Sequence, residues 1–268
     1  MSTPRLLIPS LALALTTACA STRSTDQALD GPRLMAEWEP ARGAMIVYPF
    51  ELPGALVADL GRAAELFVLV PAEERAAAES ELDAVGLDPG DYQLVPADVD
   101  TPWTRDWGPH QVVTPAGERA LVDHVFLGYP WVPADCDTDD IAYEFGEWSG
   151  EDAAVAAAAA FLDLPTVALP AIATGGNLLT DGHGRAFCTE TMLVENAAQE
   201  PPIDEPAYRA LLRDHLGVHD LVVLENTEPM GIQHIDCWMK VVDAETLLVK
   251  RAPEDHPEHG PLERNVAL

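Results

Sequence analysis

The stretch Trp103-Thr-Arg-Asp-Trp-Gly-Pro109 is the most informative part of this 268-residue chain. It places a carboxylate, Asp106, beside aromatic residues, and Gly108-Pro109 predicts a turn directly after it. A carboxylate presented at a turn is well placed to face a pocket, and an indole face attracts a flat cation. An ion pair between Arg105 and Asp106, or a turn-capping role for Asp106, is the alternative that this stretch leaves open.

A second stretch, His234-Ile-Asp236, lies far downstream. As a strand it would place His234 and Asp236 on one face, because side chains alternate with a period of two, and Cys237 on the opposite, buried face. A nearby carboxylate can orient a histidine for acid–base work. We therefore expect Asp106 and Asp236 to hold a planar guanidinium through paired hydrogen bonds, with His234 moving protons.

The third candidate is a glycine-rich segment, Gly175-Gly-Asn177 followed by Thr180-Asp-Gly-His-Gly184. Glycines let the backbone approach a ligand closely or adopt a positive φ. A hairpin that needs glycine only for its turns is the alternative.

Short apolar runs alternate with alanine-rich helical stretches along the chain. Strands are predicted at 44–48, 66–71, 92–96, 111–114, 120–126, 166–169, 178–180, 186–193, 221–224, 234–241 and 246–250, and helices at 55–65, 72–86, 153–162 and 205–216. Residues 261–268 indicate the first turns of another helix. Four rounds of roughly sixty residues favour a repeated sheet-and-helix unit stacked around an axis, although an open α/β sheet also fits this loose period.

The charge balance narrows the class of partner. The chain has 45 acidic and 15 basic residues, for a formal net charge of −30. This argues against nucleic acid or anionic lipid bound through a basic face, and favours cationic small molecules or peptides. An acidic surface kept for solubility or a salty habitat is the alternative.

The N-terminus predicts export. Arg5 precedes an apolar run at 6–15, which is too short to span a membrane, and Ala18-Cys19 resembles a bacterial lipobox. We expect residues 1–19 to be a signal peptide and Cys19 to carry a lipid, so that the protein is periplasmic or attached to the membrane of the cell envelope. Residues 20–40 are expected to form a tether before a domain at 41–268. A buried N-terminal helix is the alternative.

The remaining cysteines, Cys136, Cys188 and Cys237, show no CxxC spacing, and a disulfide involving Cys136 stays open. The chain contains no GxGxxG, P-loop or serine-elbow motif, which argues against dinucleotide, nucleoside-triphosphate and serine-hydrolase sites. We expect no cofactor and no metal. His215 and His219 are spaced for a zinc pair, but Gly217 between them is expected to end the helix.

Taken in order, three motifs resemble those of the bacterial peptidylarginine deiminase and agmatine deiminase family. They are Trp103 to Pro109, Thr174-Gly-Gly-Asn-Leu-Leu-Thr-Asp-Gly-His-Gly184 and Gln233-His-Ile-Asp-Cys-Trp238, and the resemblance runs from about Met45 to the C-terminus. It implies a pentein-type α/β propeller of five repeated ββαβ blades. Four blades are expected here, in a domain truncated at its C-terminal end.

The resemblance implies hydrolytic deimination of a guanidino group, of peptidyl-arginine or agmatine type, which releases ammonia and leaves a ureido product through a cysteine thiolate. Asp106 and Asp236 would clamp the guanidinium, His234 would be the acid and base, and Trp103 would pack on the substrate. Asn177 in the glycine-rich loop is a further candidate substrate contact.

The nucleophile is not assigned, because this chain lacks the family's glycine-rich His-Cys segment in the expected place. Substitution by Cys188 or Cys237 is one alternative, and a non-catalytic guanidinium-binding remnant is another. The substrate also stays open. Thr174 and Trp238 resemble the peptidylarginine branch, whereas residues 126–135 contain no arginine to grip a substrate carboxylate.

Overall fold

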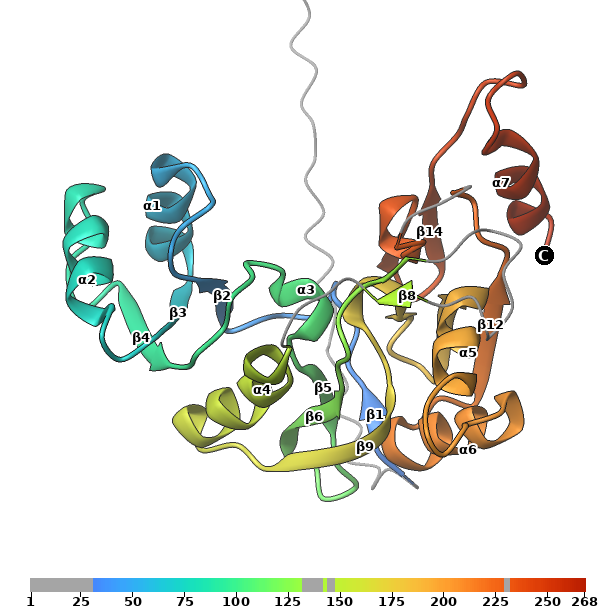
Figure 1. The fold of residues 1–268 in the computed structure, drawn as a ribbon, viewed down its shortest axis with the longest axis horizontal. Helices are drawn as coiled ribbons and strands as arrows, with labels where there is room; N and C mark the ends of the chain where they lie inside the picture. Colours follow the sequence, from blue (N-terminus) through green and yellow to red (C-terminus); the bar gives the residue numbers. More distant parts are fainter. Residues whose placement is uncertain (1–30, 132–141, 144–147, 229–231) are drawn as a thin grey trace, which may run out of the picture.

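The computed structural model describes residues 31–131, 142–143, 148–228 and 232–268. The predicted signal peptide, Cys19 and Cys136 lie outside these ranges. Within them, no helix combines the length and the apolar character that crossing a membrane requires. Figure 1 shows the sheets and helices following one another as separate units around a common centre.

The first unit is a parallel sheet with helices on one face. Its strands are β2 (Gly43–Val47), β3 (Glu65–Val70) and β4 (Tyr92–Pro96), and its helices are α1 (Gly54–Ala63) and α2 (Arg75–Ala84). The central strand is apolar on both faces, as expected where both are covered. Leu66 and Val68 pack in the cluster with the helices, whereas Phe67 and Leu69 pack in a second cluster that contains Trp107.

The second unit forms the middle of the molecule in Figure 1. Its strand order is β1-β5-β6-β9, with bounds β1 (Arg33–Leu34), β5 (His110–Val113), β6 (Arg119–Val125) and β9 (Thr166–Ile172). The β5–β6 pair is antiparallel, and α4 (Ser149–Leu162) connects β6 to its parallel neighbour β9. This unit therefore has the predicted ββαβ order.

The third unit repeats that order with two helices in its crossover. Its elements are β10 (Leu179–Thr180), β11 (Arg185–Thr189), α5 (Glu190–Ala197), α6 (Glu205–Leu216) and β12 (Asp220–Leu224). An antiparallel pair and a helix follow it, namely β13 (Met239–Asp243), β14 (Thr246–Val249) and α7 (His259–Val266). Strands β7 (Pro130–Trp131) and β8 (Ala142–Tyr143) form a short antiparallel pair.

Helix α6 shows how the sequence fixes an element's ends. The Asp204 carboxylate accepts a hydrogen bond from the backbone N–H of Ala207 at 2.9 Å, and Pro206 lies in the first turn. Gly217 ends the helix with φ of 68°, a conformation that costs glycine little. The expected end of this helix at Gly217 is thus confirmed.

The structure changes the bounds of the predicted tether and of the strand predicted at 186–193. Leu34 is buried and pairs with Val112, so the predicted tether at 20–40 overlaps the folded domain from β1 onward. The strand predicted at 186–193 ends at Thr189, where α5 begins. The apolar residues of this segment follow neither the strand period nor the helix period clearly. The pattern therefore cannot separate the end of a strand from the start of a buried helix.

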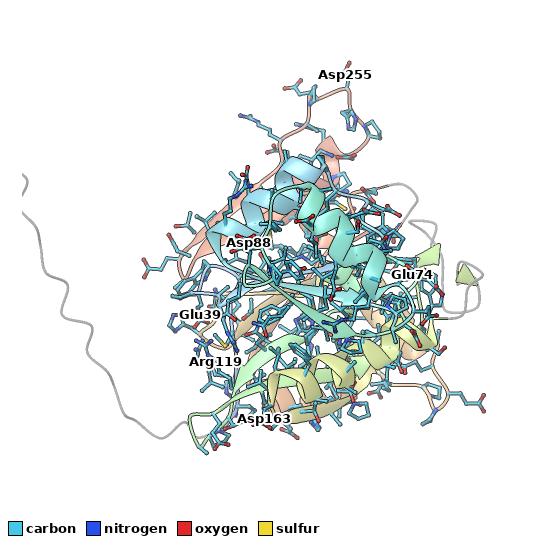
Figure 2. The ribbon with its side chains drawn as sticks, turned by 90° about the vertical axis from the view of Figure 1, so that its left-hand side faces the viewer. Glu39, Glu74, Asp88, Arg119, Asp163 and Asp255 are labelled. Atoms are coloured by element: carbon cyan, nitrogen blue, oxygen red, sulfur yellow. The ribbon has the colours of Figure 1, made fainter. Side chains whose placement is uncertain are left out.

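The acidic residues are spread over the surface. In the view of Figure 2, Asp88, Asp163 and Asp255 lie in widely separated parts of the chain, and all three are exposed. The net charge of −30 therefore does not by itself mark one face as a binding site.

Candidate active site

Asp106 lies on a one-turn helix, α3 (Thr104–Trp107), and not at the end of a strand. The helix ends where Gly108 adopts an extended conformation, as the Gly108-Pro109 turn signal indicates. Trp107 is 1% exposed and packs in the core, whereas Trp103 is 56% exposed. Only Trp103 is therefore accessible at the surface, and its packing on a substrate stays a prediction.

A buried acid from α4 supports the segment before α3. The Glu151 carboxylate accepts hydrogen bonds from the backbone N–H groups of Asp100 and Thr101, both at 3.0 Å. The Thr101 hydroxyl in turn accepts one from the indole N–H of Trp107 at 3.1 Å. These bonds tie α3 to a long helix, which limits the movement of Asp106.

His234 is placed by an unusual backbone turn. Gln233, just before it, has φ of 54°, which non-glycine residues seldom adopt. Its backbone carbonyl accepts a hydrogen bond from the Thr189 hydroxyl at 2.9 Å, and its side-chain oxygen accepts one from Thr191 at 2.6 Å. Two buried threonines at the β11–α5 junction therefore hold the turn that presents His234.

The strand predicted at 234–241 is wrong in its first half. Residues Ile235–Cys237 form a 3-10 turn, η3, so His234 and Asp236 do not share a face by strand alternation. Cys237 is exposed and not a buried core thiol, while Ile235 is fully buried. Three residues are too few for the apolar pattern to distinguish a turn from a strand, so the His-x-Asp segment could not be assigned from sequence.

The structure nevertheless brings Asp106 and His234 together. His234 Nδ1 lies 3.4 Å from Asp106 Oδ1, and both side chains are largely buried. Nε2 of His234 is buried and has no hydrogen-bond partner among the described residues. The imidazole thus has one nitrogen facing a carboxylate and another available for proton exchange.

Gly176 lies directly against this pair. It belongs to a second 3-10 turn, η2 (Gly175–Asn177), which the glycine-rich segment forms. A Cβ at this position would lie less than 3.0 Å from both His234 Nδ1 and Asp106 Oδ1. Only a glycine fits here, because the backbone at this position lies so close to the His234 and Asp106 side chains. Close approach of the backbone was one of the two roles predicted for the glycines of this loop.

Asn177 joins three segments of the site. Its amide oxygen accepts hydrogen bonds from the N–H of Thr189 at 3.0 Å and from the N–H of Ile235 at 3.3 Å. The Thr189 hydroxyl, whose one proton is shared with the Gln233 carbonyl, also lies 3.0 Å from it. Asn177 is fully buried. This placement gives Asn177 a positioning role, and the predicted substrate contact stays a prediction.

Asp236 faces cations from two other segments. Arg105 Nε lies 3.4 Å from Asp236 Oδ2, and Glu37 bridges Arg105 and Lys240. Arg105 therefore pairs with Asp236 and Glu37 and not with Asp106. The predicted alternative, an ion pair between Arg105 and Asp106, is wrong. Partial burial raises the pKa of Asp236, with a contribution from the Asp106 carboxylate, while His234 and Arg105 oppose the shift.

Three ring side chains near the site lie outside the sequence motifs, namely those of Tyr129, His110 and His124. The Tyr129 ring centroid lies 6.4 Å from that of His234, and burial, together with the Asp106 carboxylate, raises the pKa of the Tyr129 phenol. The ring centroids of His110 and His124 lie 5.5 Å apart, and burial lowers the pKa of His124 to about 3. None of these residues lies in a motif, so only the fold could reveal them.

Both described thiols are poor candidates for a nucleophile. Cys188 is fully buried in β11, and burial raises its pKa to about 12. Desolvation around its sulfur, with acidic neighbours including Glu228 and Asp236, raises the pKa of Cys237 to about 11. A thiol with a raised pKa is protonated at neutral pH and attacks slowly, which argues against substitution by either residue.

Known proteins resemble this chain in sequence and fold. A putative agmatine deiminase of Pectobacterium atrosepticum is 26% identical over 224 residues, which are 77% of this chain and 56% of the relative. A solved structure of a putative agmatine deiminase has a TM-score of 0.75 at 17% identity and matches 89% of this chain and 67% of its own. The agmatine deiminase of Enterococcus faecalis has a TM-score of 0.70 at 19% identity, with 89% and 66% covered.

These structural matches confirm the predicted pentein-type α/β fold, while the number of blades stays a prediction. The chain spans only a little over half the length of the Pectobacterium relative. The model of the Porphyromonas-type peptidyl-arginine deiminase family matches residues 33–268, which is most of the chain. This protein therefore belongs to the Porphyromonas-type peptidyl-arginine deiminase family.

Proposed function

We propose that this chain supplies the guanidinium-binding and proton-transferring part of a guanidine deiminase. The observation that carries the proposal is the convergence of Asp106 from α3 and His234 from the η3 turn, 3.4 Å apart, with Asp236 two residues beyond His234. The substrate would be a guanidino small molecule such as agmatine, or an arginine-containing peptide.

The chemistry follows from the three side chains. The two carboxylates offer acceptors to the N–H groups of the planar cation and offset its positive charge. In deimination a thiolate forms a bond to the guanidinium carbon, the C–N bond breaks, and ammonia leaves with a proton. Water then displaces the sulfur to give the ureido product. His234, with Nε2 free of partners among the described residues, is the group suited to move these protons.

Guanidinium binding without turnover is the second candidate function. It is favoured by the raised pKa values of Cys188 and Cys237, since neither described thiol is a ready nucleophile. The carboxylates would then bind the cation without a covalent step. Measurement of ammonia release from agmatine, alongside binding, distinguishes the two functions.

Replacing Asp106 or Asp236 by asparagine is expected to weaken agmatine binding to this chain by roughly 10- to 100-fold. Each substitution removes one charge-assisted hydrogen-bonding partner, worth about 1.5–3 kcal/mol. Isothermal titration calorimetry with agmatine and with a peptide ending in arginine measures the affinities, and also ranks the two substrate types.

Asp88→Asn is the matched control, because Asp88 is exposed and the substitution makes the same change in charge. Its affinity should stay within twofold of that of the unmodified protein. Equal losses in all three variants would mean that only the overall charge attracts the ligand. No loss in either Asp106→Asn or Asp236→Asn would remove the proposed site.

Agmatine binding is also expected to weaken as the pH falls. We expect the loss to begin at a pH above 3.8, the usual pKa of an aspartate. Asp236 binds a cation only when ionised, and its pKa is raised, so it becomes protonated earlier on acidification than an exposed aspartate. Calorimetry across this pH range should show the step in the unmodified protein and not in Asp236→Asn. A step that persists in the variant would assign the titration to another group.

Export and membrane attachment through a lipidated Cys19 are also proposed, on the apolar run and lipobox-like residues of the N-terminus. A periplasmic or envelope-anchored protein would meet guanidino compounds outside the cytoplasm. We propose a guanidine-deiminase domain that begins at β1, after a tether shorter than residues 20–40.

A further inference from the structure

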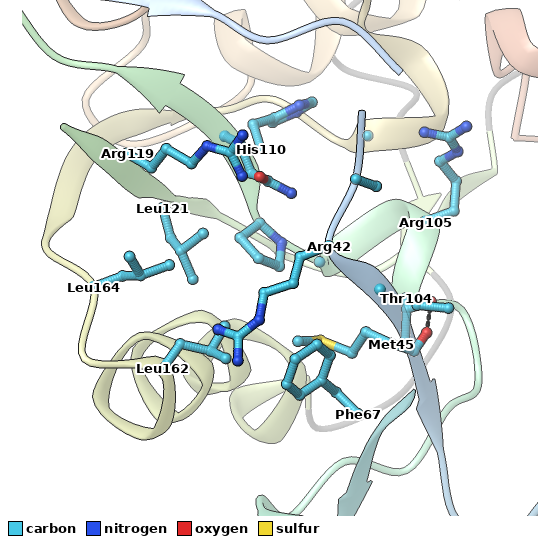
Figure 3. A pocket seen from close by; sticks show the side chains of 17 residues that line it. Arg42, Met45, Phe67, Thr104, Arg105, His110, Arg119, Leu121, Leu162 and Leu164 are labelled. Atoms are coloured by element: carbon cyan, nitrogen blue, oxygen red, sulfur yellow. Dashed lines mark hydrogen bonds between the residues drawn. The ribbon is translucent and has the colours of Figure 1, made fainter. Parts of the chain in front are cut away.

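A pocket of about 680 Å³ lies between the first and second sheet units. Its walls come from β2, β3, β5, β6, α3 and the end of α4, and Figure 3 shows it from close by. Neither Asp106 nor His234 lines it. The volume is typical of sites for small molecules.

The charges around this pocket are opposite to those of the protein as a whole. The residues that line it include Arg42, Arg105 and Arg119 and no aspartate or glutamate, although the chain has 45 acidic residues among 268. The pocket is therefore a positive region on a strongly acidic protein, and the field there favours an anion.

Arg119 is the guanidinium that is free to bind. Among the described residues it makes neither a hydrogen bond nor an ion pair, and it is exposed at the start of β6. Arg42 has only its Nε committed, through a hydrogen bond to Glu65 at 2.8 Å, and lies over the Phe67 ring at 5.6 Å. Arg105 is held by Glu37 and Asp236 and does not contribute a free guanidinium.

Apolar side chains complete the pocket. Figure 3 shows Leu121, Leu162 and Leu164 beside the Arg42 and Arg119 side chains, with Met45 and Phe67 also on the wall. Such a surface buries an aliphatic chain favourably, at about 25 cal/mol per Å² of apolar area. The pocket thus has positively charged arginine side chains on one part of its wall and apolar side chains on another.

We propose that this pocket binds a small amphipathic monoanion, namely a carboxylate that carries an aliphatic chain. The carboxylate would pair with the Arg119 fork, for which its geometry is suited, and the chain would lie on the leucines. Two guanidinium groups with Glu65 beside one of them leave a single net positive charge. That balance matches a carboxylate better than a dianionic phosphate.

Calorimetry on the 268-residue chain with octanoate tests this proposal. Octanoate should bind at least tenfold more tightly than octanamide, which keeps the chain but lacks the charge, and than butyrate, which keeps the charge but lacks most of the chain. Octylammonium and inorganic phosphate should bind more weakly than octanoate. Octanamide binding equal to octanoate binding would overturn the role of the arginines, and no octanoate binding at millimolar concentration would overturn the site.

Arg119→Gln should weaken octanoate binding at least tenfold, because it removes the uncommitted guanidinium. The matched control is Arg185→Gln, an exposed arginine of β11 that pairs with Asp220 and lies outside the pocket. It makes the same change in charge and should alter the affinity by less than twofold. Equal losses in both variants would mean non-specific attraction and overturn the proposal. Agmatine binding should be unchanged in Arg119→Gln, so the result is independent of the proposed function.

Discussion

Gly176→Ala is expected to reduce agmatine binding at least 100-fold while the chain still folds. The added methyl group would lie less than 3.0 Å from both His234 Nδ1 and Asp106 Oδ1, a separation that real Cβ atoms essentially never show. Neither neighbour can move away easily. Asp106 lies on a helix tied to Glu151 through the preceding segment, and His234 follows the turn at Gln233 that Thr189 and Thr191 hold.

The substitution should also lower stability by about 1–3 kcal/mol, as overpacking of a dense region does. Calorimetry measures the affinity, and urea unfolding followed by circular dichroism measures the stability. Gly90→Ala is the matched control, because nothing lies within 4 Å of a Cβ at that position. Unchanged agmatine affinity in Gly176→Ala would show that the Asp106–His234 pair is not packed against this glycine in solution.

The second large effect is expected at Glu195, a carboxyl buried inside the third unit. Burial raises its pKa to about 8, with the side chain 1% exposed and one carboxyl oxygen without a partner among the described residues. In the folded chain the Glu195 carboxyl therefore keeps its proton up to about pH 8. In the unfolded chain the carboxyl loses the proton near its usual pKa of 4.5.

Stability should consequently fall as the pH rises from 4.5 to about 8, because the folded state binds the extra proton in that range. At about 1.4 kcal/mol per pH unit, the loss attributable to Glu195 is on the order of 5 kcal/mol. Glu195→Gln replaces a buried neutral acid by a neutral amide of similar shape. The variant should be little changed near pH 4.5 and more stable than the unmodified protein at pH 8.

Urea unfolding at several pH values measures this difference. Glu190→Gln, on the same helix but exposed, should leave the pH dependence unaltered and change the stability by no more than about 0.5 kcal/mol. If the unmodified protein and Glu195→Gln have the same pH profile, then Glu195 is ionised in the folded state and water reaches it.

Much of the fold could be predicted from local patterns. The parallel strands at β2, β3 and β4 are short apolar runs between amphipathic helices, and their predicted positions differ from the observed ones by a residue or so. The sequence motifs also contain Asp106 and His234, which the structure places side by side, and the glycine-rich loop that lies against both; their roles stay a prediction.

The local conformation of those motifs could not be predicted. Asp106 lies on a one-turn helix and Asp236 on a 3-10 turn, both too short for a periodic pattern to identify. Cys237 was predicted as buried because a strand was assumed, and the turn exposes it instead. An ion pair between Arg105 and its neighbour Asp106 was left open as an alternative, and the structure pairs Arg105 with Glu37 and Asp236 instead, both distant in sequence.

The side chains proposed to carry the chemistry can be recognised in the sequence, because a carboxylate or an imidazole has its acceptors and protons wherever the backbone places it. The alternation of strands and helices can be recognised there too, since burial of apolar residues imposes their periods. The contacts among Asp106, Gly176 and His234, the position of Tyr129 beside His234, and the pocket shared by Arg42 and Arg119 follow from the folded arrangement alone. Those contacts join residues far apart in the chain, and the distance between such residues depends on the packing of all the elements between them.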